Sequence, residues 1–196
     1  MTRLRNISHA ASAWFSTIAA KFWSPAPASA ESGLLTRADV YALWAQADVL
    51  TWQGQFQEGE LLCRKALDIL NPAFNENDTM TATGFQNLAQ NLDAQGRYVE
   101  AEPLHRKSLD IFREVLDDYF PQTAKGFRNL ASNLNAQGCH AEAEPFYRKA
   151  LESFVAALGE NDRDTAQSYN DLALNLKAQG RSAEAEPWFR KALEIG

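Results

Sequence analysis

The segment GRYVEAEPLHRKSLDIF (residues 96–112) returns as GCHAEAEPFYRKALESF at residues 138–154 and as GRSAEAEPWFRKALEI at residues 180–195. Each copy begins with a glycine that lies 42 residues after the glycine of the copy before. One more step back reaches a divergent copy in the same register, GQFQEGELLCRKALDIL (54–70). Because a fixed period of this length is typical of repeat architectures, the repeat decides the fold.

A second block precedes each glycine. Its copies are WAQADVLTWQ (44–53), QNLAQNLDAQ (86–95), RNLASNLNAQ (128–137) and NDLALNLKAQ (170–179). Two linked blocks that recur in a fixed register do not arise by chance. The chain therefore consists of four copies of one unit.

Both blocks of the unit have helical spacing. In the second copy, apolar residues follow the i, i+3, i+4, i+7 pattern of one helix face at Phe85, Leu88, Ala89 and Leu92. The pattern continues in the other block with Ala101, Leu104, Ser108, Leu109 and Ile111. Gly96 lies between them, where a helix C-cap needs a left-handed residue. Each unit is predicted to be a helix, a tight turn and a second helix, with N-caps for the next unit in the linkers 75–79 and 161–165.

Small residues predict how these hairpins pack. Alanine recurs on the first helix at Ala89, Ala131 and Ala173, and on the second at Ala101, Ala143 and Ala185. One hairpin cannot bury its apolar face alone, so neighbouring units must stack. The predicted fold is all-α: a right-handed superhelical solenoid of four hairpins at about residues 36–77, 78–119, 120–161 and 162–196. Residues 1–35 stand outside the repeat.

These residues resemble the tetratricopeptide repeat (TPR). The series Leu130-Ala131, Gly138, Ala143 and Ala150 has that family's spacing, and Leu88-Ala89, Gly96, Ala101 and Ser108 follows it nearly as well. The period of 42 residues, with its NLA, AQG and AEPxxRKxL segments, is similar to the kinesin-light-chain type of repeat. The resemblance implies a protein-binding scaffold or adaptor rather than an enzyme. The first copy departs from it, with Ala45, Gly59 and Leu61 at motif positions.

The resemblance also implies a binding site on the concave face, which the first helices of the hairpins line. In the second copy the lining would be Thr83, Gln86, Asn87, Gln90 and Asp93. In the third it would be Lys125, Arg128, Asn129, Ser132 and Asn135, and in the fourth Gln167, Asn170, Asp171, Leu174 and Lys177.

Asn87 and Asn129 are the sharpest candidates, because an amide can pair with both the N–H and the C=O of an extended peptide. Lys125 and Arg128 could bind an acidic side chain or a terminal carboxylate. The alternative is that these polar residues solvate a helix face or cap neighbouring repeats. For Asn91, Asn133 and Asn175, which recur in every copy but the first, we favour a structural ladder between repeats over contact with a ligand.

Residues 1–35 allow three interpretations. Trp14, Phe15, Ile18 and Phe22 share one helical face, near basic residues. The segment could be a targeting peptide cleaved after Ala30, an amphipathic helix on a membrane, or a helix that packs over the first repeat. We favour a helix followed by a Ser/Ala/Pro linker.

The last hairpin carries an apolar face that no polar capping helix follows, with Trp188, Phe189, Ala192 and Leu193. Terminal repeats usually need a cap for solubility. A homodimer through this face, or further chain after Gly196, would each account for it.

Composition and motifs exclude several kinds of chemistry. The net charge is −6, and an acidic chain argues against nucleic acid as the main partner. His9, His105 and His140 show no metal spacing, and the sequence has no phosphate loop or nucleophile motif. We expect no metal, no cofactor and no catalysis. Two cysteines give no disulfide framework, so a reducing, cytoplasmic location is the default expectation.

The leading prediction is a scaffold that binds an extended peptide or helix of a partner protein in the concave groove. One alternative is a self-associating module that dimerises through the fourth copy. The other is a membrane-peripheral adaptor held by its N-terminal helix.

Overall fold

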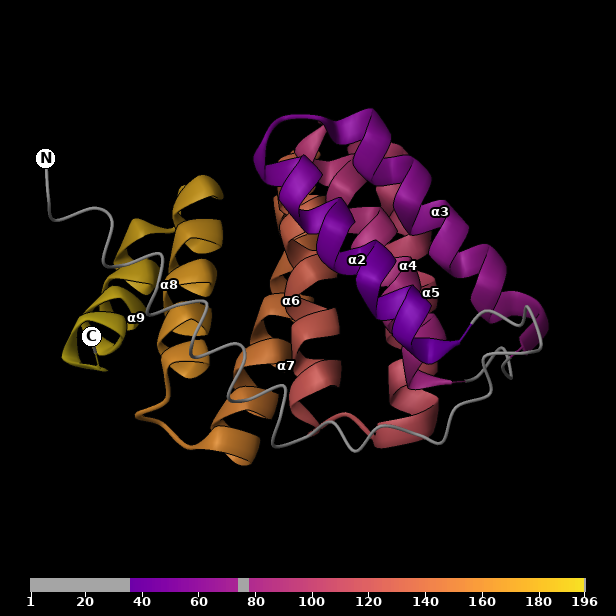
Figure 1. The fold of residues 1–196 in the computed structure, drawn as a ribbon. Coiled ribbons are helices and arrows are strands. Elements are labelled where there is room, and N and C mark those ends of the chain that lie inside the picture. Colours follow the sequence, from indigo (N-terminus) through magenta and orange to yellow (C-terminus); the bar gives the residue numbers. More distant parts are fainter. Residues whose placement is uncertain (1–35, 74–77, 196) are drawn as a thin grey trace, which may run out of the picture. The chain divides into compact units, whose positions relative to one another are not determined.

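The computed structural model describes residues 36–73 and 78–195, which hold eight helices and no strand (Figure 1). In chain order these are α2 (Arg37–Trp52), α3 (Phe56–Ala73), α4 (Thr79–Ala94), α5 (Tyr98–Leu116), α6 (Pro121–Ala136), α7 (His140–Leu158), α8 (Arg163–Ala178) and α9 (Ser182–Ile195). They pair into four hairpins, and each hairpin packs on the next, as the repeat predicts. The helix and linker expected in residues 1–35 lie outside the described residues.

A glycine closes the turn inside each hairpin. Gly96 has a φ of +75°, and the Arg97 N–H donates to the Leu92 carbonyl at 2.9 Å. This six-to-one bond is that of a Schellman motif, which places a left-handed residue at the end of a helix. Gly138 repeats the arrangement with a φ of +82°. Glycine therefore recurs at this position because the turn requires a residue with a positive φ.

Side chains cap three of the four first helices. Thr36 and Asp39 form a reciprocal capping box at the start of α2. Asp78 and Asp162 accept backbone N–H bonds at the starts of α4 and α8, which confirms the N-caps expected in those linkers. α6 has no such cap and begins with Pro121, whose missing N–H costs nothing in the first turn of a helix.

Small side chains allow the helices to approach closely. Ala89 and Ala101 are both completely buried between α4 and α5. Between hairpins, a Cβ on Gly84 would lie 2.7 Å from a methyl of Leu67, so a larger residue there would force the Leu67 side chain to move. A buried cluster that extends through α6, α7 and α8 forms the largest apolar core.

An asparagine ladder joins the hairpins at their turn ends. The Nδ2 of Asn91, Asn133 and Asn175 donates to the preceding hairpin, at Thr51 (2.8 Å), Asp93 (2.7 Å) and Asn135 (3.0 Å). All three asparagines are buried. This confirms the predicted structural role of the recurring asparagine.

Glutamine and glutamate continue the ladder. Gln137 Nε2 donates to Asn133 Oδ1 of its own helix at 2.8 Å and to Glu102 of the preceding hairpin at 2.9 Å. Gln179 bonds in the same way to Asn175 and Glu144. The hydrogen bond from Gln137, with Arg106 beside it, holds the pKa of Glu102 below its usual value in spite of partial burial. The carboxylates of Glu102 and Glu144 thus join neighbouring hairpins.

Candidate peptide-binding groove

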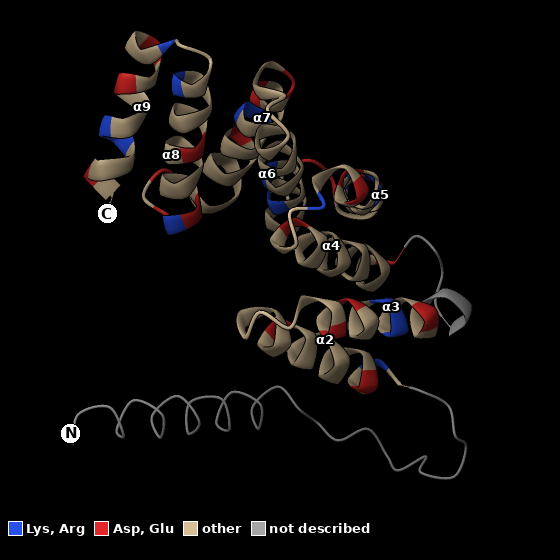
Figure 2. Cartoon of the chain, turned by 90° about the horizontal axis from the view of Figure 1, so that it is seen from above, with Lys and Arg blue, Asp and Glu red and all other residues tan. Residues whose placement is uncertain are grey.

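The first helices of consecutive hairpins carry the predicted groove residues. Figure 2 shows α4, α6 and α8 in succession along the stack. Among the predicted residues, those exposed are Gln90, Lys125, Ser132, Gln167, Leu174 and Lys177. Those partly exposed are Thr83, Gln86, Asn87, Asp93, Arg128, Asn129, Asn135, Asn170 and Asp171.

Two of the predicted residues also support the ladder. Asp93 Oδ2 lies 2.7 Å from His105 Nε2, while its other oxygen accepts from Asn133. Asn135 Oδ1 lies 2.7 Å from His140 Nδ1 and accepts from Asn175. Since their oxygens already have these partners, Asp93 and Asn135 have less capacity for a ligand than the other groove residues.

On the predicted groove face of α6 and α8, the chain pairs its own charges. Arg128 lies 3.1 Å from Asp164 and its guanidinium stacks over the Phe154 ring at 5.1 Å. Lys125 reaches the same aspartate at 4.0 Å. Both basic side chains therefore already have an acidic neighbour within the chain, Asp164 of the next repeat.

Asp171 lies in the same half of the groove, at the position of Asn87 and Asn129. Burial raises the pKa of its carboxyl, while a 2.7 Å hydrogen bond from Gln167 and the charge of Arg128 oppose the rise. Burial, together with the negative charge of Asp171, raises the pKa of Tyr147 to about 12. Asp171 thus has one hydrogen-bond donor and one nearby positive charge from this chain.

Asn129 has an unusual amide. Its Nδ2 is buried and has no hydrogen-bond partner among the described residues. A buried donor without an acceptor costs about 1–3 kcal/mol, so such groups are rare in folded proteins. This position is one of the two asparagines that the sequence singles out for holding a peptide backbone.

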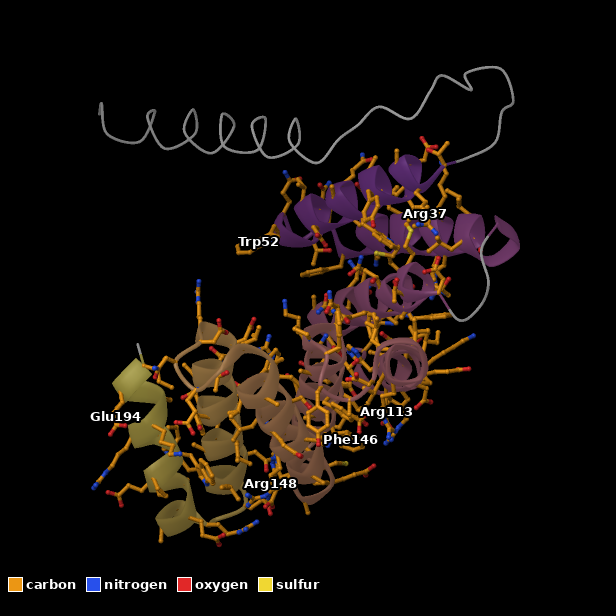
Figure 3. The ribbon with its side chains drawn as sticks, turned by 90° about the horizontal axis from the view of Figure 1, so that it is seen from below. Arg37, Trp52, Arg113, Phe146, Arg148 and Glu194 are labelled. Carbon is orange, nitrogen blue, oxygen red and sulfur yellow. The ribbon has the colours of Figure 1, made fainter. Side chains whose placement is uncertain are left out.

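The other asparagine, Asn87, lines a hollow of about 190 Å³ between α2 and α4. The remaining lining residues are Asp48, Thr51, Trp52, Cys63, Gln90 and Asn91. Trp52 is 92% exposed, and in Figure 3 its side chain extends beyond the ribbon at the end of α2. Burial and two nearby carboxylates raise the pKa of Cys63 to about 11, so its thiol stays protonated at neutral pH.

Asp48 and Trp52 were missed by reasoning from the sequence, although a signal exists for the tryptophan. The equivalent positions in the later copies are Ala94, Ala136 and Ala178. A large aromatic residue that replaces a recurring alanine and remains exposed is not needed for packing.

The C-terminal hairpin is more closed than its sequence suggests. Trp188 stacks on Tyr169 with ring centroids 5.7 Å apart, and Phe189 and Ala192 pack partly against the core. Leu193 remains 80% exposed. The apolar face expected for self-association is thus reduced mainly to Leu193 and the partly covered side chains beside it.

Within residues 36–73 and 78–195, no group of three or more His, Cys, Asp or Glu could hold a metal ion. No helix in these ranges is long and apolar enough to cross a membrane. Cys63 is buried and Cys139 is exposed, and both are free thiols.

Known structures share this arrangement of hairpins. BtubC (BKLC) from P. vanneervenii is similar with a TM-score of 0.73 and 26% identity, over 80% of this chain and 61% of that chain. The nearly identical TPR-like repeats assigned to a kinesin light chain in Podosopora anserina give a TM-score of 0.74 at 20% identity, over 80% of this chain and 74% of that one. The apo form of RapI gives 0.72 at 19% identity, over 85% of this chain and 58% of that one.

This chain thus spans less than two thirds of BtubC and of RapI. No curated protein matches its sequence. The model of the tetratricopeptide repeat matches twice, at residues 39–114 and 122–196. These two matches cover most of the chain and both linked blocks of the repeat, so the protein belongs to the tetratricopeptide repeat family.

Proposed function

We propose that this protein is an interaction scaffold that holds an extended peptide of a partner protein along the first helices of its hairpins. A TPR solenoid is typically a non-catalytic scaffold for protein–protein contacts, and its exposed surface is built from repeated positions. The observation that carries the proposal is the pair of amides at Asn87 and Asn129. Asn87 lines an open hollow and Asn129 has a donor without an acceptor.

The chemistry of the amide explains why such a pair suits a peptide. One carboxamide can accept from a backbone N–H and donate to a backbone C=O, so it holds the main chain without reading the side chains. Two amides one repeat apart would fix the direction of the peptide. Discrimination between partners would then come from the other residues of the groove.

A site-specific cross-linking experiment tests this proposal. The photo-reactive residue p-benzoyl-phenylalanine replaces Gln90 in the groove, or Glu114 on the exposed side of α5 as a control. In lysate from the native cell, we expect a partner to cross-link at position 90 and not at position 114. Combining Asn87→Ala with Asn129→Ala should abolish the cross-link.

The matched control pair is Glu114→Ala with Glu160→Ala, two exposed residues away from the amides. Circular dichroism should show that both double variants melt as the parent does. An unchanged cross-link in a folded Asn87→Ala, Asn129→Ala variant would contradict the peptide-clamp role.

Self-association is a second candidate, and the exposed Leu193 with its neighbours Trp188 and Phe189 favours it. Sedimentation velocity across a hundredfold range of concentration tests this. A dimer that Leu193→Glu converts to a monomer would support it, and a monomer throughout the range would exclude it. The proposed membrane-adaptor role depends on residues 8–24, which lie outside the described residues.

A further inference from the structure

The hollow between α2 and α4 contains a carboxylate that no positive charge of the described chain approaches. Asp48 lines the hollow from an exposed position of α2 and forms no hydrogen bond or ion pair with any described residue, and partial desolvation raises the pKa of its carboxyl. Elsewhere in the groove, aspartates have cations nearby, as Asp164 has Arg128. A partly desolvated carboxylate without a counter-ion is a favourable place for a cation.

Trp52 adds an aromatic face to the same hollow. It lies four residues after Asp48 on α2, and residues at this spacing share one face of a helix. An exposed indole attracts a guanidinium or ammonium group through its negative ring face. The chain uses this contact repeatedly with its own residues, as where Lys107 lies 4.4 Å from the centre of the Phe85 ring. Trp52 has no such cation among the described residues.

The opposite wall of the hollow offers free amides. Thr51 and Asn91 bond to each other as the first rung of the ladder, so they are occupied. Asn87 and Gln90, on α4, form no hydrogen bond with the described residues and line the same space. They can accept N–H bonds from a cationic head group or pair with the backbone that carries it.

The size of the hollow limits what can enter. Its volume of about 190 Å³ is below the ~300–1,000 Å³ of pockets that enclose whole small-molecule ligands. It suits one long side chain. The buried thiol of Cys63 at its base stays uncharged at neutral pH, so it adds no second negative charge.

We propose that this hollow binds a lysine or arginine side chain of the partner peptide, with Asp48 as its counter-ion and Trp52 as the ring against which it stacks. The inference rests on the proposed peptide-binding function, and it gives the groove a chemical preference. An acidic side chain at the same place would meet the carboxylate of Asp48 and be repelled.

Nuclear magnetic resonance of the full chain tests the preference with defined probes. The probes are the blocked hexapeptides GSRSGS, GSKSGS and GSESGS, which differ at one residue. We expect the arginine and lysine peptides to shift the indole N–H of Trp52 and the side-chain amides of Asn87 and Gln90, saturably and in the millimolar range. The glutamate peptide should leave these signals unchanged at the same concentration.

Variants identify the residues responsible. Asp48→Asn keeps the shape and removes the charge, and it should weaken binding of the arginine peptide about five- to tenfold. Trp52→Ala should weaken it to a similar extent. Asp110→Asn, at an exposed carboxylate of α5, is the matched control and should bind as the parent does.

Three results would overturn the inference: equal shifts with the arginine and glutamate peptides, no shift with either, or equal binding by Asp48→Asn and Asp110→Asn. The proposed function is tested separately, because loss of cross-linking in the Asn87→Ala, Asn129→Ala variant does not depend on Asp48. If that loss occurs while Asp48→Asn binds normally, the groove holds peptides without this charge preference.

Discussion

The two halves of the proposed groove, α2 with α4 and α6 with α8, differ in whether their carboxylates have a positive charge nearby. Between α6 and α8, Asp164 has Arg128 and Lys125, and Asp171 has Gln167 with Arg128 nearby. Between α2 and α4, Asp48 has no cation among the described residues, and the aromatic ring beside it is bare. Both halves have the same fold and the same hydrogen-bonded ladder. In one half the carboxylates have cations of this chain nearby, and in the other half Asp48 has none. In the half between α2 and α4, a partner can therefore supply the missing cation.

In both halves the hairpins are joined by the same asparagine ladder. Removing one of its hydrogen-bonding residues should cause the largest loss of stability among these predictions. Asn133→Ala removes a buried amide and takes one hydrogen bond each from Asp93, Gln137 and the Tyr98 carbonyl. Because buried polar groups without partners cost about 1–3 kcal/mol each, we expect the free energy of unfolding to fall by about 2–3 kcal/mol.

Urea unfolding followed by circular dichroism measures this loss. Gln122→Ala, at an exposed position of the same helix, is the control and should change the free energy of unfolding by less than about 0.5 kcal/mol. If the two variants unfold alike, the ladder does not hold the hairpins together.

A second prediction concerns removal of the cation that pairs with the carboxylates between α6 and α8. Arg128→Ala removes the cation near Asp171 and the nearer of the two cations at Asp164, where Lys125 remains at 4.0 Å. It should cost about 1 kcal/mol of stability, as expected for a partly exposed ion pair with a ring contact. The C-terminal half would then resemble the N-terminal half. The arginine hexapeptide should now also shift the signals of Ser132 and Gln167, which it leaves unchanged in the parent chain.

Arg163→Ala removes an exposed charge from α8 and is the control, with no new shifts expected. A folded Arg128→Ala variant that gains no second binding site would show that internal pairing is not what separates the halves.

The smallest expected effect is the loss of stability caused by the unpaired carboxylate of Asp48. Burial raises the pKa of Asp48 in the folded state, so ionising it opposes folding. The cost is full above the raised pKa and disappears below the unfolded value of about 4. Asp48→Asn should therefore raise the melting temperature at pH 7, by less than the ~2–4 °C that corresponds to 1 kcal/mol, and not at pH 3.

Thermal melts of the variant and parent at both pH values measure the difference. Asp110→Asn should leave the melting temperature unchanged at either pH. A lower melting temperature for Asp48→Asn at pH 7 would mean that the carboxylate has a stabilising partner.

Periodicity was sufficient to predict most of the fold. The recurring glycine, the capping aspartates and the paired alanines each act within one hairpin, so their roles follow from local geometry. The structural role of Asn133 could also be predicted, because an asparagine that recurs at the same place in successive copies can make the same contact between each pair of neighbouring hairpins. Its partner could not, since Asp93 lies 40 residues away and meets it only when the hairpins stack.

The candidate site was harder to predict for a related reason. The repeat pattern identifies residues that recur, whereas Trp52 is a residue that differs from the alanine found at its position in the later copies. Asp48 gives no signal in the sequence, because nothing there shows that a carboxylate lacks a cation. Lys125 and Arg128 were predicted as possible partners of an acidic group, and the sequence did not show that Asp164 of the next repeat lies beside both of them. Expectations about the groove thus depend on contacts that cross from one copy to the next.

The ladder also bears on end-to-end growth of this molecule. Every internal junction needs an amide donor on one side and an oxygen acceptor on the other. At the first copy the donor position holds Val49, and at the fourth the acceptor position holds Lys177, whose ammonium cannot accept a hydrogen bond. Copies stacked head to tail in the same register would lack this rung at every junction. Val49 and Lys177 therefore disfavour stacking of the first copy on the fourth copy of another chain in this register, because that junction would have no rung of the ladder.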